Sequence, residues 1–361
     1  MKIDGTHFTT IWPGNGNSYV EIIDQTLLPH AFKVVRLTTL QAMIHAIKTM
    51  QVRGAPLIGA AAAYGIALAM REQADDSHLQ QAAQQLLDSR PTAVNLRWAV
   101  QRMLKRLQPL PPTQRNEAAW REAAAICAED IEINQAISQH GLGLIRQLSV
   151  ARPGAPVNIL THCNAGWLAA VDWGTALAPI YAAHDAGIAV HVWVDETRPR
   201  NQGASLTAWE LGRHGVPHTV ISDNAGGHLM QHGQVDMVIV GADRVTACGD
   251  VCNKIGTYLK ALAAFDNAVP FYAAVPSPTI DWSISDGLSE IHIEQRDANE
   301  VACISGSLAD GSTATVRLLP AGSPAANPAF DVTPARLVSG IISERGICAP
   351  NELRRLFPEY A

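Results

Sequence analysis

Two different hydrophobic patterns divide the chain near residue 150. Before that point, apolar residues recur with helical spacing and predict helices over 39–50, 54–70, 77–87 and 113–148. Two short segments in which apolar and polar residues alternate, 19–23 and 32–37, predict a small antiparallel sheet near the start of the chain. We therefore expect residues 1–149 to form a mostly helical N-terminal domain with a small β-sheet.

After residue 150, short apolar runs alternate with helical stretches. The predicted strands cover 157–160, 188–194, 218–221, 237–240 and 271–275. Strands that alternate with helices are typical of βαβ units and a parallel sheet. The sequence RPGAP at 152–156 predicts a turn or linker before the first of them. We expect residues 150–361 to form a Rossmann-like parallel sheet flanked by helices, which places the chain in the α/β class.

The pattern near the C-terminus predicts one more helix, over 333–346. Thr333 would be its N-cap, Pro334 its first residue and Gly346 its end, with apolar residues between them.

The longest uncharged run of the chain, GAPLIGAAAAYGIALAM at 54–70, is bracketed by Arg53 and Arg71. A membrane-spanning helix needs roughly 20 predominantly apolar residues, and this run is shorter and dominated by Ala and Gly. We therefore expect a helix that is buried on all sides within the protein, and no membrane partner.

The overall composition indicates a globular protein and argues against nucleic acid as a partner. The 361 residues are 47% hydrophobic and 17% charged, and the net charge of −6 provides no basic field for a phosphate backbone. The six cysteines include no Cys-x-x-Cys pair, which is typical of reduced thiols in a cytoplasmic protein. The first ten residues contain no apolar core of the kind found in a signal peptide, which agrees with a cytoplasmic location.

Polar residues follow every predicted strand of the C-terminal half. The segments are 161–166 (THCNAG), 195–198 (DETR), 222–224 (SDN), 241–244 (GADR) and 276–277 (PS). Because ligands bind outside the carboxyl ends of the strands in open α/β sheets, these segments should form one crevice. A thiol, several carboxylates and two arginines gathered there would suit acid–base chemistry on a small polar molecule.

Each of these candidates also has a structural interpretation. Cys163 could be a small buried apolar residue, although a helix expected to begin near Gly166 would favour its thiolate and an apolar crevice would oppose it. Asp243 could cap a following helix or pair with Arg244. Asp195 and Glu196 could form a solvated charge pair with Arg198. His162 fits a hydrogen-bonded loop residue better than a ligand.

Neither a metal nor a nucleotide cofactor is expected. Cys248 and Cys252 have no second pair at ligand spacing, and the chain contains neither a P-loop nor a G-x-G-x-x-G after its first predicted strand. An anion could instead bind at the head of the 54–70 helix, beside Arg53. Arg53 could equally just end the apolar run, and Arg90 is open to the same two interpretations.

Six motifs in order resemble the methylthioribose-1-phosphate isomerases, which belong to the family of the alpha, beta and delta subunits of initiation factor 2B. They are RGAPLIG at 53–59, SRPTAVNL at 89–96, THCNAG at 161–166, DETRPRNQG at 195–203, GADR at 241–244 and NKIGT at 253–257, and the similarity continues to NPAFDVTP at 327–334. The resemblance implies Cys163 and Asp243 as catalytic residues. It also implies substrate contacts by Arg53, Gly54, Ala55, Arg90, Gln202, Asn253 and Lys254.

The activity implied by this resemblance is the isomerisation of S-methyl-5-thio-α-D-ribose 1-phosphate to S-methyl-5-thio-D-ribulose 1-phosphate in methionine salvage, a part of methionine biosynthesis, by a homodimer. Asp243 would protonate the ring oxygen, which at neutral pH requires burial to raise its pKa. Cys163 would remove the C2 proton or shape the site for a hydride shift. The alternatives are an isomerase of 5-deoxyribose 1-phosphate or ribose 1,5-bisphosphate, and a non-catalytic regulatory subunit of the same fold.

Overall fold

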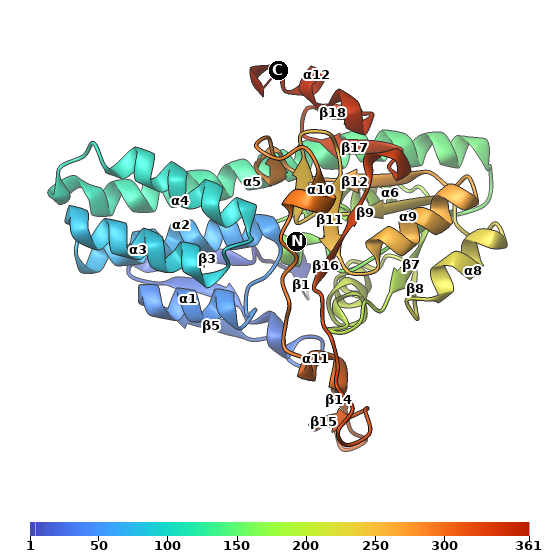
Figure 1. Ribbon diagram of the computed structural model, residues 1–361, viewed down its shortest axis with the longest axis horizontal. Helices are drawn as coiled ribbons and strands as arrows, with labels where there is room; N and C mark the ends of the chain where they lie inside the picture. Colours follow the sequence, from blue (N-terminus) through green and yellow to red (C-terminus); the bar gives the residue numbers. More distant parts are fainter. Residues whose placement is uncertain (4, 361) are drawn as a thin grey trace.

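The computed structural model describes residues 1–3 and 5–360. Figure 1 shows a group of helices, coloured blue to green, beside a sheet with helices on its two faces, coloured green to red. A narrow two-stranded hairpin, β14 (Cys303–Ser307) and β15 (Thr313–Arg317), projects from the body of the molecule.

The N-terminal half is helical, as predicted. Its helices are α1 (Leu40–Lys48), α2 (Ala55–Glu72), α3 (Asp76–Ser89), α4 (Val94–Leu107) and α5 (Pro112–Ala151). The start of α1 is fixed by Thr39, whose side chain accepts a hydrogen bond from the backbone N–H of Ala42, and Asp75 caps α3 in the same way. Of these five helices, α4 was not predicted.

Helix α2 lies at the centre of this half and packs against the other four helices. Its residues from Leu57 to Met70 are almost all buried in one hydrophobic core. The prediction of a helix buried on all sides is confirmed. Among the described residues, no helix is long and apolar enough to cross a membrane.

Small antiparallel strands lie beside these helices. β3 (Ile11–Pro13), β4 (Val20–Ile23) and β5 (Val34–Leu37) form the antiparallel sheet that the alternating segments predicted. Two shorter strands, β1 (Lys2–Ile3) and β2 (Thr6–His7), pair at the start of the chain.

A seven-stranded sheet forms the C-terminal half, after a turn at the predicted RPGAP segment. Its strands are β6 (Val157–Thr161), β7 (Val190–Asp195), β8 (His218–Ile221), β9 (Met237–Val240), β12 (Phe271–Ala274), β17 (Gly340–Ser343) and β18 (Gly346–Cys348). The first five are the predicted strands, and β18 alone is antiparallel to its neighbour. Helices α6 (Ala178–Asp185), α7 (Ala208–His214), α8 (Ala225–Gln231) and α9 (Thr257–Asp266) connect them.

The strand order of this sheet is β18-β17-β12-β9-β6-β7-β8. Numbered along the chain, the first six strands follow the 3-2-1-4-5-6 order of doubly wound sheets. The order reverses between β6 and β9, which lie side by side, and ligands bind at such a switch point. The fold therefore directs attention to the residues that follow β6 and β9.

The predicted helix over 333–346 is wrong. The chain there forms the end of β16 (Phe330–Thr333), a single 3-10 turn and the antiparallel pair β17–β18. Ile341 and Ile342 are consecutive and both fully buried, because both faces of β17 are covered by hydrophobic cores. Gly346, at φ +130°, is the residue where the chain turns back into β18.

A second sheet lies next to the first, in the order β13-β10-β11-β16, with β10 (Arg244–Thr246), β11 (Val251–Lys254) and β13 (Ile280–Asp281). It carries Asn253 and Lys254 on β11 and begins directly after Asp243. The remaining short helices are α10 (Gly287–Glu290), α11 (Asn299–Ala302) and α12 (Leu353–Leu356).

Candidate active site

Cys163 and Asp243 follow the two strands at the switch point of the large sheet. β6 and β9 are parallel neighbours, with Leu160 opposite Val238, so the segments after both strands open at the same edge. All nine residues of the sequence hypothesis line one cavity of about 40 Å³: Arg53, Gly54, Ala55, Arg90, Cys163, Gln202, Asp243, Asn253 and Lys254. Four of them come from the N-terminal half and five from the C-terminal half.

The Cys163 thiol is buried, with 7% of the residue exposed. Its Sγ–H donates a hydrogen bond to Oε1 of Gln202 over 3.0 Å, and its backbone N–H donates to Oγ1 of Thr197. Burial raises the pKa of the thiol, while the positive charges of Arg53 and Lys254 act in the opposite direction. The thiol form is therefore favoured in the free protein.

The helix expected near Gly166 does not provide a helix dipole for Cys163. Only a three-residue 3-10 turn, Trp167–Ala169, follows, and Cys163 itself has a left-handed backbone with φ +65°. The sequence argument for a thiolate stabilised by a helix N-terminus is thus wrong at this position.

Arg53 lies against the segment that carries Cys163 and does more than end the apolar run. Its guanidinium donates to Oδ1 of Asn164 and, over 2.6 Å, to the backbone oxygen of the same residue. Asn164 in turn donates from Nδ2 to Glu210 over 2.9 Å. Burial lowers the pKa of Arg53, whereas Cys163 and Asp243 raise it. A buried guanidinium with donors to spare suits an anionic ligand.

Helix α2 begins in the cavity wall. Gly54 precedes it at φ +91°, and a Cβ at this position would lie 2.6 Å from the Cα of Ala169. Only glycine therefore allows the helix to start this close to the segment after β6. The N-terminus of a helix carries partial positive charge and free N–H groups, which favours a phosphate here.

Two further cations line the same cavity. Lys254 is buried and its Nζ lies 4.3 Å from the centre of the Phe330 ring, and burial lowers the pKa of its amine. Arg90 forms an ion pair with Glu294 at 3.0 Å, while its Nε is buried without a hydrogen-bond partner among the described residues. Arg53, Arg90 and Lys254 thus place three basic side chains around the cavity.

Asp243 neither caps a helix nor pairs with Arg244, so both of its structural interpretations are wrong. The next element is strand β10 and not a helix, and Arg244 donates to the carbonyl of Thr92 and pairs with Asp281. The backbone N–H of Asp243 donates to the carbonyl of Cys252, and its side chain is left facing the cavity. This position leaves the carboxyl free to exchange a proton with a bound ligand.

The acidic residues at the end of β7 are not a solvated charge pair. Asp195 is fully buried and its Oδ2 lies 2.8 Å from Nδ1 of His162 and 3.1 Å from Nζ of Lys260. His162, Asp195 and Asp223 form the one group of described residues with metal-ligand spacing. Both ring nitrogens of His162 are already in hydrogen bonds, and the ammonium of Lys260 lies beside Asp195, so this group does not fit a metal.

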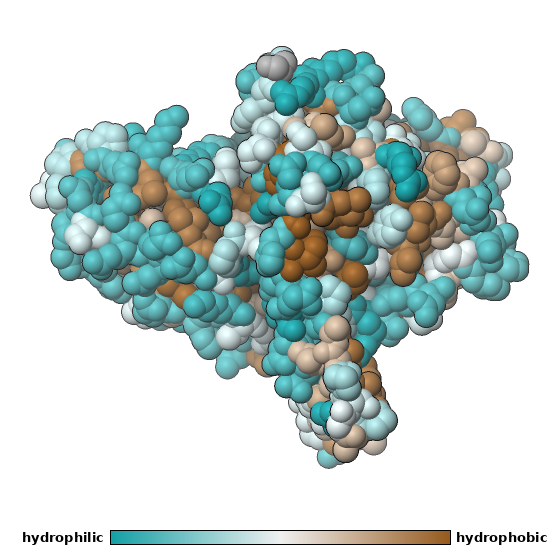
Figure 2. All heavy atoms as spheres, in the orientation of Figure 1, coloured by the Kyte–Doolittle hydropathy of each residue, from teal (hydrophilic) through white to brown (hydrophobic). Residues whose placement is uncertain are grey.

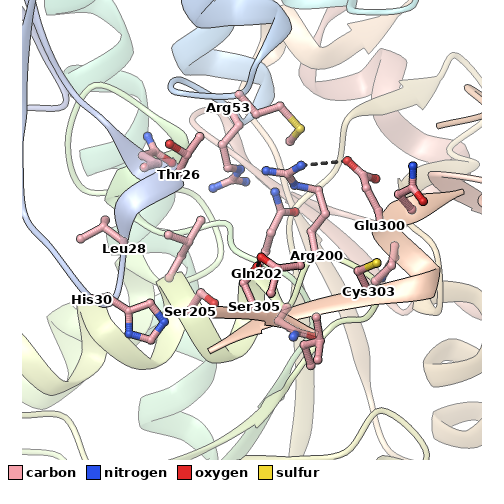
Figure 3. Close-up of a pocket in the computed structure, with 18 residues that line it drawn as sticks. Thr26, Leu28, His30, Arg53, Arg200, Gln202, Ser205, Glu300, Cys303 and Ser305 are labelled. Carbon is pink, nitrogen blue, oxygen red and sulfur yellow. Dashed lines mark hydrogen bonds and ion pairs between the residues drawn. The ribbon is translucent and has the colours of Figure 1, made fainter. Parts of the chain in front are cut away.

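A larger cavity of about 440 Å³ adjoins the first one, and Met50, Arg53 and Gln202 line both. Figure 3 shows Leu28 and His30 on one side of it and Cys303 and Ser305 of the hairpin on another, with Arg200 paired to Glu300. The hairpin projects beyond this cavity, and its surface mixes hydrophilic and hydrophobic residues (Figure 2).

Sequence reasoning missed Glu210, which lies beneath the site on α7. Its carboxyl accepts hydrogen bonds from Asn164, from the backbone N–H groups of Trp167 and Leu168, and from the hydroxyl of Tyr181. Burial raises its pKa to about 7. These partners are 29 to 46 positions away along the chain, so no local motif could have revealed them.

Comparison with known proteins identifies the family of the chain. The model of the initiation factor 2 subunit family matches residues 51–350. The chain belongs to this family. Methylthioribose-1-phosphate isomerases of Rhodospirillum rubrum and Acidiphilium cryptum are each 65% identical to it, over all of this chain and 94% and 99% of those proteins.

Solved structures of the same family share the fold. The 5-methylthioribose 1-phosphate isomerase of Pyrococcus horikoshii OT3 is 38% identical, with a TM-score of 0.82 over 99% of this chain and 100% of that chain. The translation initiation factor eIF-2B subunit delta from A. fulgidus is 37% identical, with a TM-score of 0.79 over 98% of this chain and 100% of that chain. The fold thus occurs both in a protein named as an isomerase and in one named as a translation initiation factor subunit.

Proposed function

We propose that the chain isomerises S-methyl-5-thio-α-D-ribose 1-phosphate to S-methyl-5-thio-D-ribulose 1-phosphate, a step of methionine salvage. The observation that carries the proposal is that Cys163 and Asp243 line one cavity, together with three basic side chains and the N-terminus of helix α2. The names and high identity of the curated relatives support the same substrate.

Asp243 acts as the acid in this proposal. Phosphate on the anomeric oxygen prevents the sugar ring from opening spontaneously to a free aldehyde. Proton transfer from Asp243 to the ring oxygen breaks the bond between that oxygen and C1, and leaves C1 short of electrons. The cations around the cavity hold the phosphate and position C1 and C2 beside the two catalytic side chains.

Hydrogen then passes from C2 to C1 by one of two routes. In the proton route, Cys163 as thiolate removes the C2 proton and the electron pair forms an enol. The thiol returns a proton to C1, and the enol hydroxyl gives its proton to the Asp243 carboxylate as the ketone forms. In the hydride route, hydrogen moves from C2 to C1 with its electron pair, and the C2 hydroxyl gives its proton to the Asp243 carboxylate as the ketone forms. The hydrogen bond from the Cys163 thiol to Gln202 and the raised pKa of that thiol support the hydride route. Turnover in deuterium oxide separates the routes: deuterium at C1 of the product supports proton transfer, and its absence supports hydride transfer.

The adjoining cavity suits the group on C5. At about 40 Å³ the first cavity has room for only about three waters, so the substrate must extend past Met50 into the second one. Leu28, Leu206 and Ile304 line that second cavity, and the guanidinium of Arg200 is already paired with Glu300. An apolar methylthio group fits this lining better than the second phosphate of ribose 1,5-bisphosphate. Competition among ribose 1-phosphates with different C5 groups would measure the preference.

A regulatory subunit without catalysis is the alternative from another class, because the fold also occurs in an initiation factor subunit. The presence of both Cys163 and Asp243 in the cavity favours an enzyme. Turnover of S-methyl-5-thioribose 1-phosphate, followed by phosphorus NMR, tests the proposal. We expect a new 1-phosphoketose signal, also with protein that has been dialysed against a strong chelator. Binding of the sugar phosphate without its conversion would support the regulatory role.

The assembly and location belong to the same proposal. We expect a homodimer that works in the cytoplasm, with a domain division at residues 149 and 150. The six cysteines are all free in the structure, which suits a reducing compartment. Helix α5 continues to Ala151, two residues past this division, and Ile137 and Ile145 in its second half pack in the core of the large sheet. Sedimentation at several protein concentrations would test the dimer.

A further inference from the structure

A buried histidine joins the loop after β6, which carries the catalytic thiol, to the loop after β11, the strand that ends at the buried lysine. His162 lies between Thr161, the last residue of β6, and Cys163, and it is 1% exposed. Its Nδ1 lies 2.8 Å from Oδ2 of Asp195, at the end of β7. Its Nε2 lies 2.8 Å from the backbone oxygen of Ile255, which directly follows Lys254. One side chain therefore connects three strand ends of the site.

The hydrogen-bond partners determine the protonation of this ring. A carbonyl oxygen accepts only, so Nε2 must carry a hydrogen. The carboxylate of Asp195 also accepts only, so Nδ1 must carry one as well. A neutral ring would require a proton on Asp195, which the ammonium of Lys260 at 3.1 Å from the same oxygen disfavours. His162 is thus an imidazolium held between two acceptors.

The charges around the ring are consistent with this state. Asp195 and Asp223 lie with it in one cluster. Asp331 accepts hydrogen bonds from the backbone of Gly256, in the loop after β11, and of Tyr258, at the start of α9. Lys260 is the positive charge that faces Asp195. The ring also packs on Gly256, where a Cβ would lie 3.0 Å from its Cε1. The histidine therefore fills the space between the two loops as well as bonding to both sides of it.

The geometry points to His162 as a doubly protonated positioning residue that sets the Cys163 loop against the loop after β11, next to Asn253 and Lys254, during the isomerisation. The role rests on the proposed function, because these loops matter only if they hold the substrate. His162 acts through its neighbours and contacts no substrate itself, since it does not line the cavity. Its two N–H groups make separate connections. The one on Nδ1 holds the Cys163 loop to Asp195 on β7, and the one on Nε2 holds the Cys163 loop to Ile255 in the loop after β11.

Two substitutions distinguish these connections. An asparagine places an amide N–H near the position of Nδ1, so H162N keeps the bond to Asp195 and loses the bond to Ile255. A glutamine reaches the position of Nε2, so H162Q keeps the bond to Ile255 and loses the bond to Asp195. Losing a hydrogen bond from a charged donor corresponds to roughly a tenfold to hundredfold effect. H162N should mainly raise KM for S-methyl-5-thioribose 1-phosphate, and H162Q should mainly lower kcat.

His191 offers a matched control on β7. Its Nε2 bonds to Oγ1 of Thr219 away from the site, so H191Q should leave kcat and KM unchanged. Changes in H162N and H162Q that affect only thermal stability, or that alter kcat and KM identically in both, would overturn the positioning role.

A measurement on the unmodified protein covers the case in which neither variant folds. The chain contains 13 histidines, and a proton–nitrogen NMR spectrum of protein with 15N-labelled histidine shows which rings carry two N–H groups. We expect one ring, with signals protected from solvent exchange, to carry both N–H groups, because both of its partners are acceptors. A spectrum without such a ring would overturn the proposal. This result does not depend on turnover, so an inactive protein with the protected imidazolium would refute the proposed function alone.

Discussion

Replacing Glu210 by glutamine tests how the buried carboxyl beneath the site contributes to stability. The residue is 1% exposed, and four donors converge on its two oxygens. An amide offers one accepting oxygen and turns an N–H toward groups that themselves donate. The variant E210Q should therefore be less stable than the wild type at every pH, by about 1–3 kcal/mol for each donor left without a partner.

The size of the loss should depend on pH, because burial raises the pKa of Glu210 to about 7, against 4.5 for an ordinary glutamate. The folded chain then binds this proton more tightly than the unfolded chain does. The stability gained from that proton is fully present below about pH 4.5 and is lost as the pH rises through about 7. Between about pH 5 and pH 8 the wild type should lose about 2.5 kcal/mol through this group. Glutamine does not titrate and shows no such loss.

Urea unfolding, followed by tryptophan fluorescence at several pH values, measures the difference. The gap in unfolding free energy between wild type and E210Q should narrow by about 2.5 kcal/mol from about pH 5 to about pH 8. E117Q removes a carboxyl that is 78% exposed on α5 and provides the matched control. Parallel curves for wild type and E210Q across this range would refute the reasoning about Glu210.

Three further results are expected. D243N keeps the shape of the acid but not its transferable proton, so kcat should fall by about 10² to 10⁴ with little change in KM, and a near-normal kcat would exclude Asp243 as the acid. Iodoacetamide should modify Cys163 more slowly than the exposed Cys248, and mass spectrometry should show saturating substrate slowing it further; unchanged modification would remove Cys163 from the site. A side chain at a positive φ costs about 1–3 kcal/mol, and G54A should destabilise the chain by more than this because its Cβ would also meet Ala169. In G311A, at a similar φ with open space around it, the loss should stay within that range. Equal losses of the two variants in urea unfolding would contradict the argument.

The central strands could be predicted because their residues are buried on both faces. The run Met237–Val240 is apolar throughout, all four residues are buried, and the predicted bounds match β9. The same property misled the prediction near the C-terminus. Ile341 and Ile342 belong to a strand of that kind, but Thr333 and Pro334 before them have the composition of a helix start. Local signals at the ends of a segment could not reveal that the sheet had room for two more strands.

Helix α4 and the β14–β15 hairpin were missed because they lack the usual signals. Helix α4 has Ala93 at its N-cap, with no side chain that caps the first turn, so the sequence shows no clear start. The β14–β15 hairpin is mostly exposed, and Val316 on β15 remains 52% exposed. Without a buried face, such strands lack the alternation that identifies a half-buried strand. The nine site residues, by contrast, lie in motifs whose order along the chain carries the resemblance, and the fold brings them to one cavity.

Three consecutive residues after β6 explain why this cavity needs both halves of the chain. His162 bonds to β7 and to the loop after β11, Cys163 bonds to Thr197 and Gln202, and Asn164 bonds to Arg53 and Glu210. The left-handed backbone at Cys163 turns the chain at this point, so the groups of one short stretch contact the neighbouring strand, the segment after it and the N-terminal helices at once. Arg53, Gly54 and Ala55 lie at the start of α2, far from the sheet in sequence. The sheet alone would therefore supply the thiol and the acid, but without α2 it would lack the helix N-terminus and the buried guanidinium that suit the phosphate.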